Sequence, residues 1–115
     1  MMTAVFLAAF LQSAAINSQR DAYLACLKTA TKTATAQKMP PASFEAFLRQ
    51  NCAAIEATFE ASLIAFDLKN KVPRKQAASD AKLQVDDFVA SSVERYELMN
   101  TPKPAPPSPS RPERG

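Results

Sequence analysis

The chain has 115 residues, a formal net charge of +3, a single glycine, and neither histidine nor tryptophan. This length corresponds to one domain, and without histidine there are no Ser-His or Cys-His nucleophile pairs and no imidazole metal ligands. The only glycine is Gly115, so no glycine-rich loop is present to cradle a phosphate. We therefore expect a protein that is not an enzyme, with no catalytic residues, no cofactor and no metal site.

The first fifteen residues have the pattern of a secretory signal peptide. Residues 4–11 are all apolar, and Ser13 and Ala15 provide the small side chains that a signal peptidase requires before its cleavage point. The run is shorter than the ~20 apolar residues of a membrane span. The pattern predicts a cleaved signal peptide over residues 1–15 and a periplasmic or secreted protein. Residues 1–3 lack lysine and arginine, so a docked apolar helix and an uncleaved membrane tether remain alternatives.

The two cysteines, Cys26 and Cys52, are placed symmetrically about the strongest helix breaker of the body, Met39-Pro40-Pro41. If two antiparallel helices are joined there, the cysteines lie level across the hairpin, as a disulfide requires. Two buried free thiols are the alternative, because cysteine is among the most buried residue types. We expect a Cys26–Cys52 disulfide, which suits an oxidising compartment and agrees with the predicted signal peptide.

Apolar residues recur at helical spacing in three segments of the body. They predict helices over about 18–37, 44–70 and 73–100, with Ser43 as the N-cap of the second and Pro73 as the first residue of the third. The expected fold class is all-α, a small antiparallel three-helix bundle over residues 16–100 with a disulfide-stapled hairpin. A core of this size is small, and a disulfide is a usual source of added stability.

The apolar stripes define the expected core. It comprises Tyr23, Cys26, Leu27, Ala30 and Ala34 in the first helix, Phe44, Phe47, Leu48, Cys52, Ile55, Phe59, Leu63 and Phe66 in the second, and Ala78, Ala81, Val85, Phe88, Val89, Ser92, Val93, Tyr96 and Met99 in the third. The opposite face of the second helix, with Arg49, Glu56, Glu60 and Asp67, is expected to be solvated. The Glu56–Glu60 pair is a weak signal for metal binding or proton sharing, because no histidine accompanies it.

The last fifteen residues, 101–115, contain six prolines. This composition excludes helix and sheet and predicts a disordered, extended Pro-rich tail. Its P-x-x-P spacings would suit a docking peptide. Such spacings arise readily in any proline-rich stretch, so a solvated tail is the preferred interpretation.

Two surface regions are candidate contact sites. One is a basic cluster at the turn between the second and third helices, formed by Lys69, Lys71, Arg74 and Lys75. It could bind an anion or a lipid headgroup, or it could be a solvated connection that complements the helix dipole. The other is an apolar contact surface at Phe44 and Phe47, beside the hairpin turn.

The resulting expectation is an exported, non-enzymatic helical protein that acts by binding. Its partner would be an envelope protein or an unfolded client, contacted through the hairpin end or the tail. The alternative is a membrane-surface or membrane-tethered envelope component that uses the N-terminal apolar segment and the basic turn over residues 69–75. The small excess charge and the absence of aromatic residues among the basic ones argue against nucleic acid as a partner.

We predict that the full-length chain, produced in a Gram-negative host and recovered from the periplasm, begins at Ile16. Neither cysteine should react with a thiol label until reductant is added. Intact mass spectrometry with and without reductant measures both properties. A full-length cytosolic product with two free thiols would contradict the signal peptide and the disulfide together.

Overall fold

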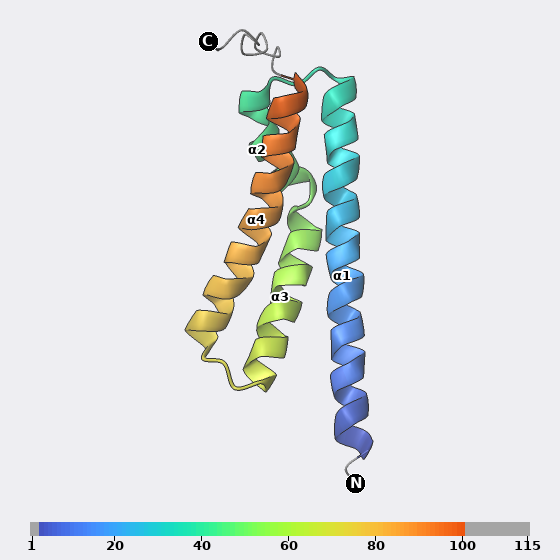
Figure 1. The fold of residues 1–115 in the computed structure, drawn as a ribbon, viewed down its shortest axis with the longest axis vertical. Coiled ribbons are helices and arrows are strands. Elements are labelled where there is room, and N and C mark those ends of the chain that lie inside the picture. The colour runs from blue at the N-terminus through green and yellow to red at the C-terminus, as the bar shows by residue number, and fades with distance from the viewer. Residues whose placement is uncertain (1–2, 101–115) are drawn as a thin grey trace, which may run out of the picture.

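A computed structural model describes the backbone of residues 3–100 and the side chains of residues 15–100, and this range contains helices and no strands. The helices are α1 (Thr3–Ala36), α2 (Pro41–Asn51), α3 (Ala53–Lys69) and α4 (Arg74–Asn100). The chain follows α1 in one direction, returns along α2 and α3, and then runs back along α4 (Figure 1). Four helices therefore form three antiparallel arms.

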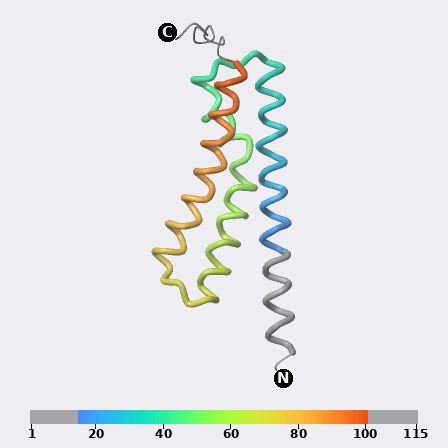
Figure 2. Tube along the Cα trace, viewed as in Figure 1, coloured from blue at the N-terminus to red at the C-terminus, as the bar shows by residue number. Residues whose placement is uncertain are grey.

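The second arm is bent at Cys52, which corrects the expectation of one unbroken helix over residues 44–70 and of three helices in all. Cys52 has φ −112° and ψ 14°, outside helical values. Just before it, the Asn51 side-chain amide donates to the Phe47 carbonyl at 2.8 Å, which competes with the backbone ladder. The Cys52 N–H still donates to the Leu48 carbonyl at 3.0 Å, so the arm bends but continues (Figure 2).

α1 begins at Thr3 and not near residue 18 as predicted, because the apolar residues 4–11 continue the helix in the N-terminal direction; the remaining helix boundaries lie near the predicted ones. α2 begins at Pro41 with Pro40 as its N-cap, so Ser43 lies inside the first turn and is not the cap that we expected. Pro73 precedes α4 and its carbonyl accepts the Ala77 N–H at 2.9 Å. α4 ends at Asn100 as predicted. Among the helices of the described range, none has a stretch sufficiently long and apolar to cross a bilayer.

α1 is continuous from Thr3 to Ala36, so the expected cleavage point after Ala15 lies within helical backbone. The signal peptide over residues 1–15 concerns processing of the chain and stays a prediction. The predicted disordered tail, residues 101–115, lies outside the described residues.

The core contains two aromatic groups that join all three arms. Phe44 of α2 and Tyr96 of α4 are fully buried and stack with ring centroids 3.9 Å apart. The Tyr96 hydroxyl donates to the Met39 carbonyl at 2.6 Å, which ties the end of α4 to the α1–α2 connection. Further along the bundle, Tyr23 of α1 stacks on Phe59 of α3 at 5.7 Å. These contacts provide much of the buried apolar area in a small core.

Most of the predicted core residues are buried or half-buried, with three exceptions. Ile55 is 37% exposed and lies at the edge of the core, beside residues of α1 such as Cys26. In α4, Ala77 is buried and Ala78 is exposed, so the buried face is shifted by one residue at the start of the helix. Met99 is 65% exposed because neither α1 nor α2 covers it.

The predicted Cys26–Cys52 disulfide is present. The two Cα atoms lie 5.9 Å apart, and the bridge joins α1 to the point where α2 ends and α3 begins. Both cysteines of the chain are used, and Cys52 is only 1% exposed.

Removing this bridge should lower the free energy of unfolding by roughly 3–4 kcal/mol, because the closed loop restricts the unfolded chain. Reduction of the native protein and the double variant Cys26→Ala/Cys52→Ala should show similar losses in denaturant titrations. Equal stability with and without the bridge would contradict its role as a staple.

Candidate functional site

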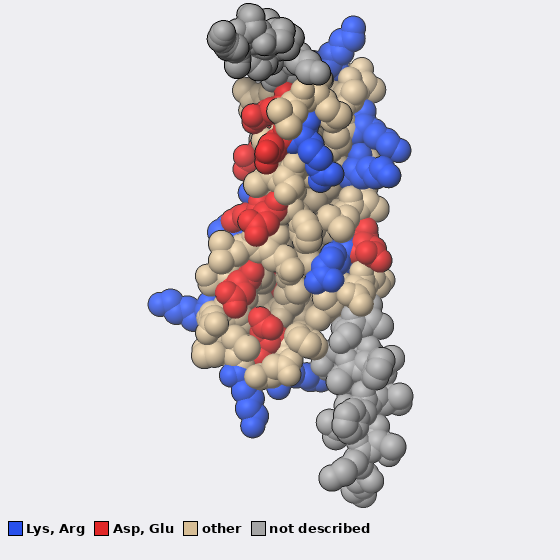
Figure 3. All heavy atoms as spheres, in the orientation of Figure 1, with Lys and Arg blue, Asp and Glu red and all other residues tan. Residues whose placement is uncertain are grey.

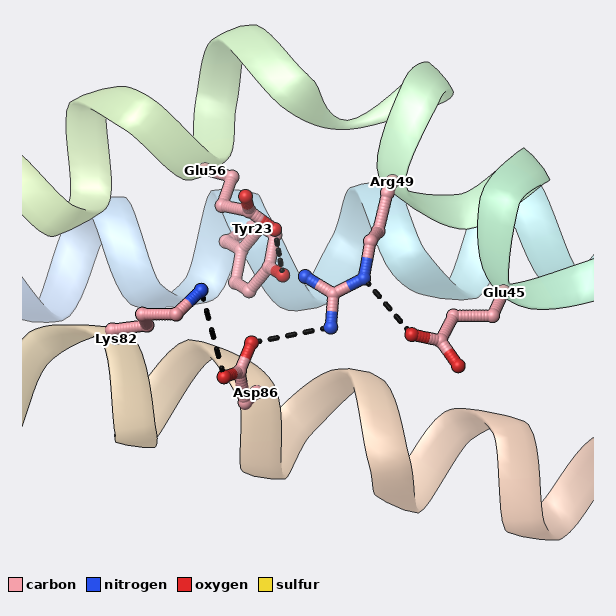
Figure 4. Close-up of polar contacts among 6 residues, drawn as sticks. All are labelled: Tyr23, Glu45, Arg49, Glu56, Lys82 and Asp86. Carbon is pink, nitrogen blue, oxygen red and sulfur yellow. Dashed lines mark hydrogen bonds and ion pairs between the residues drawn. The ribbon is translucent and has the colours of Figure 1, made fainter.

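A cluster of charged side chains joins α2 to α4 through ion pairs (Figure 4). The Arg49 guanidinium donates to Glu45 on its own helix and to Asp86 of α4, each at 3.1 Å. Lys82 Nζ lies 3.9 Å from the second oxygen of Asp86. Because these pairs are partly exposed, each contributes only about 0–1 kcal/mol, so the cluster orients the helices more than it stabilises them.

A hydrogen bond beside this cluster crosses the core. The Tyr23 hydroxyl, from α1, donates to Glu56 Oε1 of α3 at 2.8 Å (Figure 4). Burial of Tyr23, followed by the hydrogen bond and the negative charge of Glu56, raises the pKa of the phenol well above its ordinary value. Tyr23 therefore remains protonated and serves as a hydrogen-bond donor, not as a base.

The face of the second arm that we expected to be solvated is half-buried instead. Arg49, Glu56, Glu60 and Asp67 are all partly covered, because the bent arm turns this face towards α4. Burial, followed by the negative charge of Glu56, raises the pKa of Glu60 above its ordinary value.

Within the described residues, no three histidine, cysteine or carboxylate side chains are placed to hold a metal ion. The arrangement thus holds the helices together.

The opposite side of α4 is open. α1 and α4 contact each other much less than either contacts α3. Between them lies a groove of about 790 Å³, which we call the α1–α4 groove. It is lined by Leu24, Leu27, Lys28, Thr31 and Lys32 of α1 and by Phe88, Ser92, Arg95, Leu98 and Met99 of α4. Its floor is apolar and its charged residues are all cations.

Large apolar side chains in the α1–α4 groove are exposed to solvent. Leu98 is 74% exposed, Met99 is 65% exposed and Leu24 is 38% exposed. Single exposed apolar residues are normal on protein surfaces, whereas several in one groove make that groove a candidate interaction site. Basic side chains gather over the upper half of α1 and the neighbouring part of α4, while acidic side chains follow the outer side of α4 (Figure 3).

Sequence reasoning missed the α1–α4 groove. Leu24 and Leu98 lie off the apolar stripes of their own helices, so each taken alone resembles an ordinary surface residue. The two come together only because α1 and α4 lie side by side in the folded chain, and helical periodicity does not contain that information.

The structure also places the residues that we expected to form contact sites. Lys69, Lys71, Arg74 and Lys75 are all exposed around the α3–α4 turn, so they share one end of the bundle.

The expected apolar contact surface at the hairpin end is not exposed. Phe44 is fully buried because the Tyr96 ring covers it, and Phe47 is half-buried. Exposed apolar surface lies in the α1–α4 groove instead.

Comparison with family models, with curated proteins and with solved structures finds no match to this chain.

Replacing Glu60 by glutamine should raise the temperature of thermal unfolding at neutral pH. The raised pKa means that the ionised carboxylate is disfavoured in the folded state, so removing the charge stabilises it. The gain should disappear as the pH falls towards about 4, because the native carboxyl then takes up a proton as well. Circular dichroism melts across this pH range measure the effect.

Glu97→Gln is the matched control, since Glu97 lies on an exposed part of α4. It should change the unfolding temperature little at any pH. A stabilisation by Glu60→Gln that is the same at all pH values would rule out the electrostatic explanation.

Proposed function

We propose that this chain is an exported, non-enzymatic binding protein that holds a helix of a partner protein in the α1–α4 groove. The observation that carries the proposal is the set of exposed apolar side chains, Leu24, Leu98 and Met99, gathered in one groove. Burying them against a partner would remove apolar surface from water, which is the main driving force of protein association. A helix laid in an apolar groove is a recurring mode of peptide recognition.

The dimensions of the groove suit a short helix. Its lining on α4 extends from Phe88 to Met99, which is about 16 Å at the helical rise of 1.5 Å per residue. This corresponds to about three helical turns. A partner helix between α1 and α4 would add a fourth arm to the three present, in the manner of a helix bundle.

The disulfide supports placement of the protein in an oxidising compartment, where such bonds persist. Together with the predicted signal peptide, it favours a periplasmic or secreted protein. The proposed partner is accordingly an envelope protein or an unfolded client that exposes an amphipathic helix.

The second candidate function is attachment to a membrane surface. It is supported by the exposed cations at the α3–α4 turn, Lys69, Lys71, Arg74 and Lys75. Binding to anionic vesicles that weakens with added salt would favour this function. Absence of vesicle binding would leave the groove as the better-supported site.

The proposed function predicts that an alanine-rich helical peptide of about 14 residues binds the native protein, if it has leucines at i, i+3, i+4 and i+7 and glutamines at the flanks. The variant Leu98→Gln should weaken this binding by about tenfold, because a leucine side chain would no longer be buried. Fluorescence anisotropy with a labelled peptide measures the affinity.

Leu83→Gln is a matched control on the same helix. Leu83 is 59% exposed and does not line the α1–α4 groove, so its replacement should leave affinity unchanged. Equal losses in both variants, or no binding by the native protein, would contradict the groove as the binding site.

A further inference from the structure

We infer that the α1–α4 groove selects a partner helix with carboxylates on both flanks of its apolar face. The inference rests on the proposed function and specifies the chemistry of the partner. It starts from the three charged residues of the groove, Lys28 and Lys32 on α1 and Arg95 on α4. Because cations stand on both walls, a helix lying on the apolar floor would have a positive charge on either side.

Lys28, Lys32 and Arg95 have no carboxylate partner, as is true of most cations in the described residues. Arg49 and Lys82 pair with carboxylates on the opposite side of α4. No ion pair among the described residues includes Lys28, Lys32 or Arg95, and no aspartate or glutamate lines the groove. The groove therefore presents uncompensated positive charge to whatever occupies it, and an acidic occupant is electrostatically complementary.

The geometry indicates where the carboxylates of the partner must be. Lys28 and Lys32 are four residues apart, so their side chains lie one helical turn apart on the same wall. Two carboxylates one turn apart on the facing flank of the partner would match them. One carboxylate on the other flank would match Arg95, whose planar guanidinium can hold both oxygens at once.

Other occupants fit less well. The Pro-rich segment over residues 101–115 contains three cations and one acid, so the groove would repel it. If the α1–α4 grooves of two copies of the chain packed against each other, the same three cations of each copy would face one another and repel. An acyl chain prefers an enclosed apolar pocket. Leu98 is 74% exposed and Met99 is 65% exposed, so the α1–α4 groove is open to solvent. An open groove suits a helix that lies along it.

The test uses the native protein with its disulfide intact and three labelled peptides. All have the leucine pattern of the peptide described above, and they differ only in flanking residues, which are glutamate, glutamine or lysine. At low salt the glutamate peptide should bind about 5- to 10-fold more tightly than the glutamine peptide, as expected for three rim ion pairs. The lysine peptide should bind most weakly, and added salt should bring the three affinities together.

A charge-reversal variant, Lys28→Glu/Lys32→Glu/Arg95→Glu, should invert the order so that the lysine peptide binds best. The matched control is Lys69→Glu/Lys71→Glu/Lys75→Glu, which changes the net charge equally but at the α3–α4 turn, outside the groove. It should preserve the order. All six residues are exposed, so both variants should fold, as circular dichroism can verify.

The outcomes separate the inference from the proposed function. Equal affinity for the three peptides, with sensitivity to Leu98→Gln, would overturn the acidic selection and leave the groove as a binding site. Binding of none of the peptides would overturn both. Binding of laurate in the groove without binding of the glutamate peptide would make the occupant an anionic lipid and overturn the inference. Inversion of the order by the control variant would also overturn it, because the selection would then follow net charge.

Discussion

The covalent link between Cys26 and Cys52 constrains the whole bundle. It holds the middle of α1 at the point where the second arm bends, with the two Cα atoms 5.9 Å apart. The three arms are joined by short connections and bury few side chains. The disulfide therefore provides stability that a larger core would otherwise provide. The aromatic stacks on either side of it, Phe44–Tyr96 and Tyr23–Phe59, then align the three arms.

The two sides of α4 have different surroundings. On one side the bent arm turns Arg49 towards Asp86 and Glu56 towards Tyr23, so the polar groups there have partners. On the other side, the surface between α1 and α4 keeps exposed leucines and cations without carboxylate partners. A bundle closed on one side by its own ion pairs and open on the other is a suitable receptor for one additional helix.

The difference between the two sides of α4 supports the proposed function. The partly buried cluster around Arg49 contains groups that already pair with one another, and the Tyr23 phenol is held protonated as a hydrogen-bond donor to Glu56. The α1–α4 groove differs, because several of its apolar side chains are exposed and its cations have no carboxylate partners. A bound ligand would bury those apolar side chains and pair the cations. The arrangement is the one that the proposed binding function requires, and the disulfide fixes α1 to the second arm of this bundle.

The sequence by itself determined the all-helical class, the breaks at Met39–Pro41 and Pro73, and the pairing of Cys26 with Cys52. These follow from local causes: proline lacks the N–H that a helix interior needs, and symmetric spacing about a turn brings two positions level. Only the tertiary structure decided the bend at Cys52, the partial burial of Glu56 and Glu60, and the α1–α4 groove. Each of these depends on which faces of different helices meet and how far apart the helices lie, and the periodicity of a single helix specifies neither.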